Sequence, residues 1–109
     1  MAGMTESALK RKIIQAVKVL RNRDGLPLHW LKIHGNAFQR TGEPDLILCY
    51  AGRFLAVELK VGSNKPTRIQ SHRLNQWREA GGAVCVCYSL KQFVEFIETL
   101  KVGSDEKFS

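Results

Sequence analysis

The sequence has no apolar run long enough to cross a membrane. Its longest runs, such as LILCY, FLAV and AVCVCY, have the length of a strand and are interrupted by charge or glycine, whereas a membrane helix needs about 20 apolar residues. The continuous apolar segment that opens a secreted chain is also missing, because the N-terminus is basic and amphipathic. We therefore expect a protein that acts in the cytoplasm and has no membrane partner.

Cysteine is scarce, and the number of cysteines is odd. Cys49, Cys85 and Cys87 all lie in apolar runs, so we expect small buried core residues in a reducing compartment. Cys85-x-Cys87 also allows a zinc site, because strand alternation directs both thiols to similar faces. No second Cys or His pair stands at zinc-finger spacing, however, which favours the packing role.

Acidic residues are outnumbered: 10 Asp and Glu against 17 Lys and Arg give a net charge of +7. A compact basic domain gains affinity for polyanions by releasing their condensed counterions. Nucleic acid is thus a candidate partner, although ribosomal proteins, membrane-surface proteins and a need for solubility produce the same charge. The 109 residues, 44% of them apolar, suit one domain with one core, which we expect over 1–101, followed by a flexible tail over 102–109.

The order of periodic segments predicts an α/β domain. Helical apolar spacing begins at Thr5, a plausible N-cap, and recurs over 67–80 and after Ser89, where Gln92 completes a capping box. Short apolar runs predict strands over 28–33, 46–50, 54–59 and 83–88. The order αβββαβα predicts a central mixed sheet flanked by helices. Because both faces of the 46–59 hairpin are apolar, we expect helices on both sides of the sheet.

The predicted hairpin turn, Ala51-Gly52, decides which side chains face one another. A two-residue turn pairs Tyr50 with Arg53 and, at the far end, Asp45 with Glu58. The Cβ atoms of such a pair lie about 4.5 to 5.5 Å apart, and Lys60, two residues after Glu58, points to the same side. A three-residue loop with a bulge would instead shift the register and could send Asp45 to the opposite face.

Two acids and an amine at one end of an apolar ribbon predict a metal site. Carboxylates placed opposite each other raise each other's pKa, and a divalent cation removes the conflict. Mg²⁺ prefers oxygen ligands, and the backbone carbonyl of Leu59 could add one. Such an ion lowers the pKa of a bound water and stabilises charge on a phosphoryl oxygen, as phosphodiester hydrolysis requires. Lys60 would orient the water or stabilise the developing charge.

Glu6 is a third candidate acid, because it lies on the inward face of the first helix, three residues before Leu9. An acid in the first turn equally complements the helix dipole, so both interpretations stay open. Each of the other three charged residues also has an ordinary explanation when taken alone: Asp45 as a Pro-Asp turn residue, Glu58 and Lys60 as alternating surface residues. Their convergence favours a site.

A longer pattern surrounds these residues. Gly42-Glu43-Pro44-Asp45-Leu46 is followed by Gly52 to Lys60, then by Gln70 and by Gly81-Gly82. This pattern resembles the VRR-NUC family of the PD-(D/E)xK nuclease superfamily, over most of the chain from about Glu6 to Tyr88. The resemblance implies a restriction-endonuclease-like core and Mg²⁺ or Mn²⁺ as cofactor. It also implies the following roles: metal ligands Asp45 and Glu58, catalytic lysine Lys60, first-helix acid Glu6, and a glutamine beside the site, Gln70.

Stand-alone members of this size are typical of phages and bacteria, which implies a bacterial or phage-infected host cell. The similarity of the family to Holliday junction resolvases implies a homodimer that acts on branched DNA. Basic side chains in the surrounding loops and helix are candidates for DNA contacts, although each can equally belong to a solvated face: Arg40, Lys65, Arg68, His72 and Arg73, together with His34 and Arg78. Trp30 and Trp77 lie on apolar periodicities, so we expect them in the core.

The sequence thus predicts a metal-dependent, structure-selective DNA endonuclease, and two other function classes remain open. A non-catalytic DNA-binding module of the same fold predicts salt-sensitive binding without cleavage. A basic structural protein predicts that Glu58→Gln changes stability but leaves function untouched. The intact Asp, Glu and Lys favour the enzyme, because a DNA-binding module gains nothing from acids beside phosphates.

Overall fold

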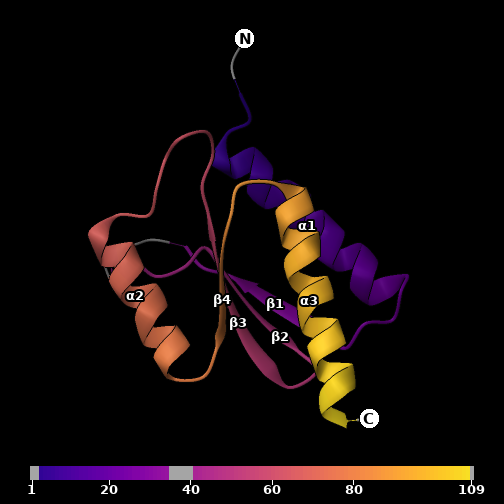
Figure 1. The fold of residues 1–109 in the computed structure, drawn as a ribbon. Helices are drawn as coiled ribbons and strands as arrows, with labels where there is room; N and C mark the ends of the chain where they lie inside the picture. The colour runs from indigo at the N-terminus through magenta and orange to yellow at the C-terminus, as the bar shows by residue number, and fades with distance from the viewer. Residues whose placement is uncertain (1–2, 35–40, 109) are drawn as a thin grey trace.

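The computed structural model describes residues 3–34 and 41–108, and the side chains of 3–34 and 41–100. Its elements follow the predicted order (Figure 1): α1 (Glu6–Asn22), β1 (Leu28–Lys32), β2 (Leu46–Tyr50), β3 (Arg53–Leu59), α2 (Arg68–Glu79), β4 (Ala83–Cys87) and α3 (Leu90–Phe108). α3 continues past residue 101, where we expected the folded domain to end; the flexibility of 102–109 stays a prediction. No helix in the described ranges is long and apolar enough to span a membrane.

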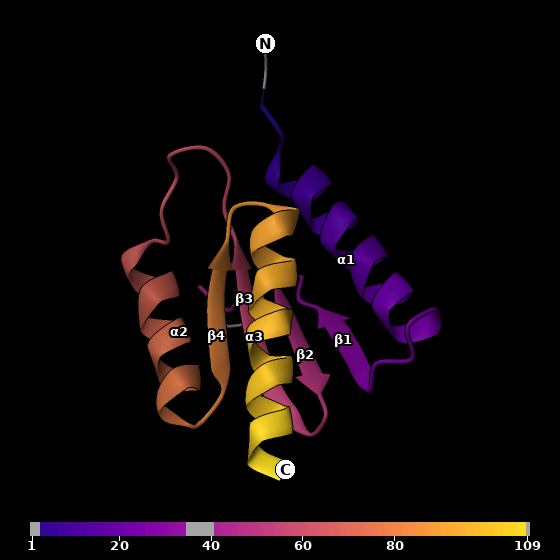
Figure 2. The same cartoon turned by 45° about the vertical axis from the view of Figure 1, so that its right-hand side comes forward.

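The four strands form one mixed sheet in the order β1-β2-β3-β4. β1, β2 and β3 are antiparallel neighbours, and β4 pairs with β3 in parallel. α2 connects the two parallel strands. α1 and α3 lie side by side over one face of the sheet (Figure 2). The predicted central mixed sheet flanked by helices is confirmed.

The hydrophobic core lies between the sheet and the pair α1 and α3. Leu9, Ile13 and Val17 recur every four residues on α1, which puts them on one helix face, and all three are fully buried. Phe93 and Ile97 on α3 pack into the same cluster. Burying one such side chain contributes roughly 1.5 to 3 kcal/mol. The periodicity that predicted the two helices is therefore the pattern of the core itself.

α2 covers part of the other face of the sheet. The ring of Trp77 stacks on that of Phe54 with centroids 4.7 Å apart, and Leu74 is buried. A Cβ atom at Gly82 would stand 2.9 Å from Phe54 Cδ1 and 3.1 Å from the Trp77 carbonyl oxygen. Glycine at this position therefore allows the close approach of α2 to the sheet.

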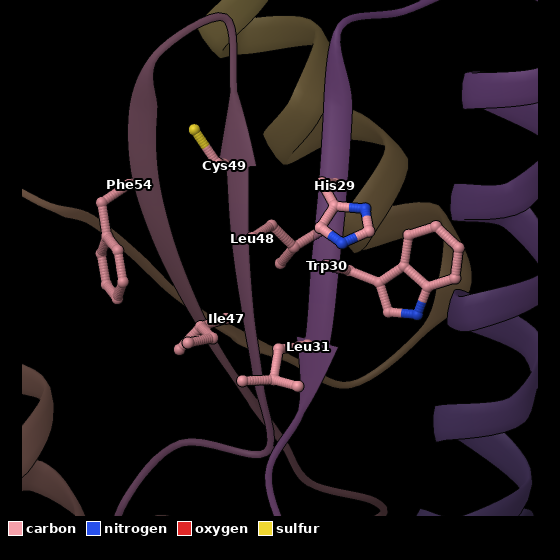
Figure 3. Close-up of a pocket in the computed structure, with 7 residues that line it drawn as sticks. All are labelled: His29, Trp30, Leu31, Ile47, Leu48, Cys49 and Phe54. Atoms are coloured by element: carbon pink, nitrogen blue, oxygen red, sulfur yellow. The ribbon is translucent and has the colours of Figure 1, made fainter.

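Helices lie on both sides of the sheet, as predicted, but α2 covers only part of its face. Beyond Phe54, the strands β1 and β2 leave an apolar hollow of about 310 Å³, whose lining includes Leu31, Ile47 and Cys49 (Figure 3). Leu31 is 57% exposed. The reason is that α1 and α3 both pack on the opposite face, and α2 packs against β4.

Cys49 is consequently exposed, contrary to the expected core position, whereas Cys87 is buried and Cys85 half-buried. Cys85 and Cys87 have their sulfur atoms 3.2 Å apart. The bond to Cys85, together with burial, raises the pKa of the Cys87 thiol, and zinc binding requires thiolates. Among the described residues, no third His, Cys, Asp or Glu joins the two thiols in a group that could hold a metal ion. Of the two roles weighed for the thiol pair, the structure favours packing.

The hairpin turn has the predicted length and register. Tyr50 pairs with Arg53, and the ladder runs to Leu46 opposite Val57. Both turn residues have positive φ, 51° at Ala51 and 82° at Gly52, as type I′ turns require. Alanine is strained in this conformation, while Asn and Gly adopt it readily.

Replacing Ala51 by Asn should therefore stabilise the protein by about 0.5 to 1 kcal/mol, because it removes left-handed strain from the turn. Urea denaturation would measure the free energy of unfolding. Ala51→Val is the matched control, and a β-branched residue with positive φ should destabilise. Equal stabilities of the two variants would contradict the proposed turn geometry.

Candidate functional site

Asp45 lies directly before β2. One step beyond the last pair of the β2–β3 ladder, Leu46 and Val57, it stands opposite Glu58. Its backbone carbonyl accepts the Ile33 N–H at 2.9 Å, so the pairing with the β1 side extends to this residue. Its side chain turns to the neighbouring strand, where Oδ2 accepts the backbone N–H of Leu59 at 2.8 Å. The carboxylate is thus fixed against β3, and its second oxygen, Oδ1, remains for other partners.

Glu58 is the most deeply buried charged residue of the described part, with 2% of its surface exposed. Oε2 lies 3.5 Å from Lys60 Nζ, and Oε1 is buried without a hydrogen-bond partner. Burial, and then the charge of Asp45, raises the pKa of Glu58 to about 7, although Lys60 opposes the change. A buried carboxylate oxygen without a partner is costly to keep ionised.

Lys60 joins this pair to α1. Its backbone N–H donates to the Cys87 carbonyl oxygen at 3.1 Å, which fixes it against β4. Its Nζ lies 3.8 Å from Glu6 Oε1 as well as beside Glu58. Thr5 caps α1 by accepting the Ala8 N–H, so Glu6 stands in the first turn. The structure therefore brings together the three charged residues that we predicted to converge, and it places Glu6, whose role the sequence left open, beside them.

Lys10 is a site residue that we did not predict. Its Nζ is 3.6 Å from Asp45 Oδ1. The signal was present, because Lys10 lies four residues after Glu6 and three before Ile13, so the three positions share one side of the helix. Lys10 nevertheless lies beside the apolar stripe of α1 and not on it, so helical periodicity alone does not mark it as a site residue.

Gln70 caps α2. Its Oε1 accepts the Thr67 N–H at 2.8 Å, and Thr67 Oγ1 accepts the Gln70 N–H at 3.2 Å, which makes a capping box. Thr67 and Gln70 have the sequence spacing of this motif, which we had not noted. The role of Gln70 beside the site stays a prediction, as does a ligand role for the Leu59 carbonyl.

The predicted DNA-contacting residues differ in their exposure and in their contacts within the protein. Lys65, Arg68 and His72 are exposed, and Arg40 lies outside the described residues. Arg73 donates from Nε to the Thr41 carbonyl at 3.2 Å, which ties α2 to the segment before Asp45.

The two tryptophans are half-buried packing residues, although we expected both in the buried core. Trp77 stacks on Phe54 and donates from Nε1 to Glu43 Oε1 at 3.2 Å. Trp30 packs against the core cluster. Together with Arg73, Trp77 therefore fixes the chain immediately before Asp45 to α2.

A pocket of about 440 Å³ with a mixed polar and apolar lining begins at Val61, the residue after Lys60. It is lined by residues from the N-terminus, from the loop after β3 and from the start of α3: Gly3, Met4, Val61, Gly62, Ser63, Asn64, Tyr88 and Ser89. Tyr88 Oη donates to the Asn64 carbonyl at 2.8 Å, which fixes one side of the pocket. The end of β3 therefore has open space beside it.

No protein-family profile matches the sequence, and no curated protein is significantly similar to it. Solved structures do match. One, described as "VRR_NUC domain", is 26% identical with a TM-score of 0.65, and the match covers 88% of this chain and 97% of that one. In sequence and in fold, the chain is similar to this VRR-NUC domain.

A second VRR-NUC structure, "VRR_NUC domain protein", has the same fold, with a TM-score of 0.69 at 19% identity over 91% of this chain and 89% of that one. The structure of Hjc, a Holliday junction resolvase from Archaeoglobus fulgidus, matches at 16% identity with a TM-score of 0.49 over 72% and 67% of the two chains. The sequence motif predicted a resemblance to VRR-NUC domains, which these matches support, and a restriction-endonuclease-like fold, which is confirmed.

The raised pKa of Glu58 predicts a pH-dependent stability in the absence of metal. Unfolding returns the pKa from about 7 to 4.5, so the folded protein holds this proton more tightly and loses stability as pH rises through that window. Glu58→Gln should abolish this loss and stabilise the protein at pH 8 by on the order of 2 kcal/mol.

Urea denaturation in EDTA at pH 5 and pH 8 would measure the effect. Glu79→Gln, at an exposed position of α2, is the matched control and should retain the pH dependence of the wild type. If Glu58→Gln showed the same pH dependence as the wild type, the raised pKa would be wrong.

Proposed function

We propose that this protein is a Mg²⁺- or Mn²⁺-dependent DNA endonuclease. Asp45, Glu58 and Lys60 form the proposed active site, at which it hydrolyses phosphodiester bonds. The observation that carries the proposal is the buried, unpartnered Oε1 of Glu58 beside a second carboxylate. The similarity to VRR-NUC structures supports a nuclease of that superfamily.

The residues at this position fit a hard divalent cation. Asp45 Oδ1 and Glu58 Oε1 are carboxylate oxygens that accept no hydrogen bond from the described backbone, and Mg²⁺ is commonly held by one or two carboxylates with water and phosphate as further ligands. Glu6 and the Leu59 carbonyl are further candidates for ligands. A cation here would also favour the ionised form of Glu58, which the metal-free protein disfavours.

Bound there, Mg²⁺ or Mn²⁺ would supply an activated water and stabilise charge on the phosphoryl oxygen. Lys60 provides the remaining positive charge. Its ammonium lies within 3.8 Å of both Glu58 and Glu6, so it is positioned to donate a hydrogen bond to the attacking water or to a phosphate oxygen. A donor fixed in this way needs little rearrangement when negative charge develops.

The substrate that we propose is branched DNA, such as a four-way junction, cut by a homodimer. The net charge of +7 supports a polyanionic substrate, and the resemblance of VRR-NUC domains to junction resolvases supports branched DNA. Two equivalent sites in a two-fold dimer suit the cutting of two strands.

Cleavage of a labelled four-way junction and of a linear duplex would test the proposal. We expect Mg²⁺-dependent cutting with a preference for the junction. Asp45→Ala and Lys60→Ala should each lower the rate by about 100-fold or more, because each removes a group at the reacting phosphate. Lys18→Ala, at an exposed position of α1, is the control for lost charge and should retain most activity.

Equal cutting by all variants would remove the proposed roles. The alternative, a non-catalytic DNA-binding module, is favoured by the excess of basic residues alone and predicts salt-sensitive binding without cleavage at any metal concentration. Gel-shift measurements in EDTA at two salt concentrations, run beside the cleavage assay, would distinguish the two functions.

The apolar hollow over β1 and β2 supports the dimer, since an exposed apolar patch beside the edge strand β1 is a surface that a second copy can cover. Light scattering after gel filtration should give twice the chain mass of 12.3 kDa. Leu31→Glu should yield the monomer, because it buries a charge in the interface. Lys32→Glu is the neighbouring control, and a dimer that survives Leu31→Glu would place the interface elsewhere.

A further inference from the structure

Lys10 occupies the side of Asp45 that the proposed metal requires. Asp45 Oδ2 is engaged by the Leu59 N–H at 2.8 Å, so Oδ1 is the oxygen left for a cation. Lys10 Nζ lies 3.6 Å from that same Oδ1. In the metal-free protein, the ammonium thus stands where an incoming positive ion would share a ligand.

The two lysines of the site differ in how firmly they are held. Lys60 has 11% of its side chain exposed and pairs with both Glu58 and Glu6. Lys10 has 24% of its side chain exposed and, among the ion pairs of the described residues, is joined only to Asp45. Its four-carbon stem is flexible. Lys10 can therefore swing out to solvent, while Lys60 stays beside Glu58.

We propose that Lys10 is a displaceable cation that competes with the divalent ion for Asp45. This inference rests on the proposed metal site. Because an ammonium and a divalent cation on one carboxylate oxygen repel each other, metal loading requires Lys10 to leave Asp45. Lys10 thus stabilises the charged carboxylate in the empty site and lowers the affinity of the protein for metal.

The test is the affinity for Mn²⁺ alone, measured by isothermal titration calorimetry without DNA. Lys10→Met removes the charge but retains most of the stem, so the Kd should fall about three- to five-fold. Lys10→Arg retains the charge and should match the wild type. Lys12→Met removes the same charge two residues away, at an exposed position on another side of α1, and should change the Kd by less than about two-fold.

Equal affinities of Lys10→Met and Lys12→Met would overturn the inference, because the effect would then be one of net charge. Weaker binding by Lys10→Met would also overturn it, since Lys10 would then help to position Asp45 for the metal. A wild type that binds no Mn²⁺, or that binds it as well as Asp45→Ala does, would overturn the proposed metal site itself. Circular dichroism melting of each variant would confirm that it is folded.

Discussion

The register of the β2–β3 hairpin determines which charged side chains meet. Asp45 continues the ladder opposite Glu58 only because the turn consists of Ala51 and Gly52, both with positive φ. A shift by one residue would send the side chains of one strand to the opposite face of the sheet. Backbone pairing therefore fixes the two acids, and the Leu59 N–H then orients Asp45.

The cost of this arrangement falls on Glu58. The Glu58 carboxylate has 2% exposure and one oxygen without a hydrogen bond. Whenever it is ionised, it destabilises the fold. A side chain that served packing alone would avoid that cost, as would a glutamine with both groups bonded. Local conflicts of this kind are expected at functional sites, where the surrounding core holds them in place.

Local rules predicted most of the fold. The apolar spacing of α1 and the two-residue turn depend on neighbours in sequence, and the structure has both as predicted. The motif from Gly42 to Lys60 is equally local, and the fold that it predicted is confirmed. The errors concern contacts between distant elements. Exposure of Cys49 depends on how much of the sheet α2 covers, which strand periodicity does not encode. The same limit applies to Lys10, whose contact with Asp45 depends on where α1 crosses the end of the sheet.

The site combines rigid acids with one firmly held lysine, Lys60, and one more mobile lysine, Lys10. Asp45 and Glu58 have short side chains on paired backbone, so their oxygens are fixed in space by the sheet. Lys10 and Lys60 reach those oxygens over long stems. Lys10 lies on α1, whereas Lys60 directly follows β3. The ammonium groups offset the carboxylate charges, so the two acids can stay in place without a divalent cation. The site can also exchange an ammonium for another cation without moving the sheet, which is the property that a reversible metal site requires.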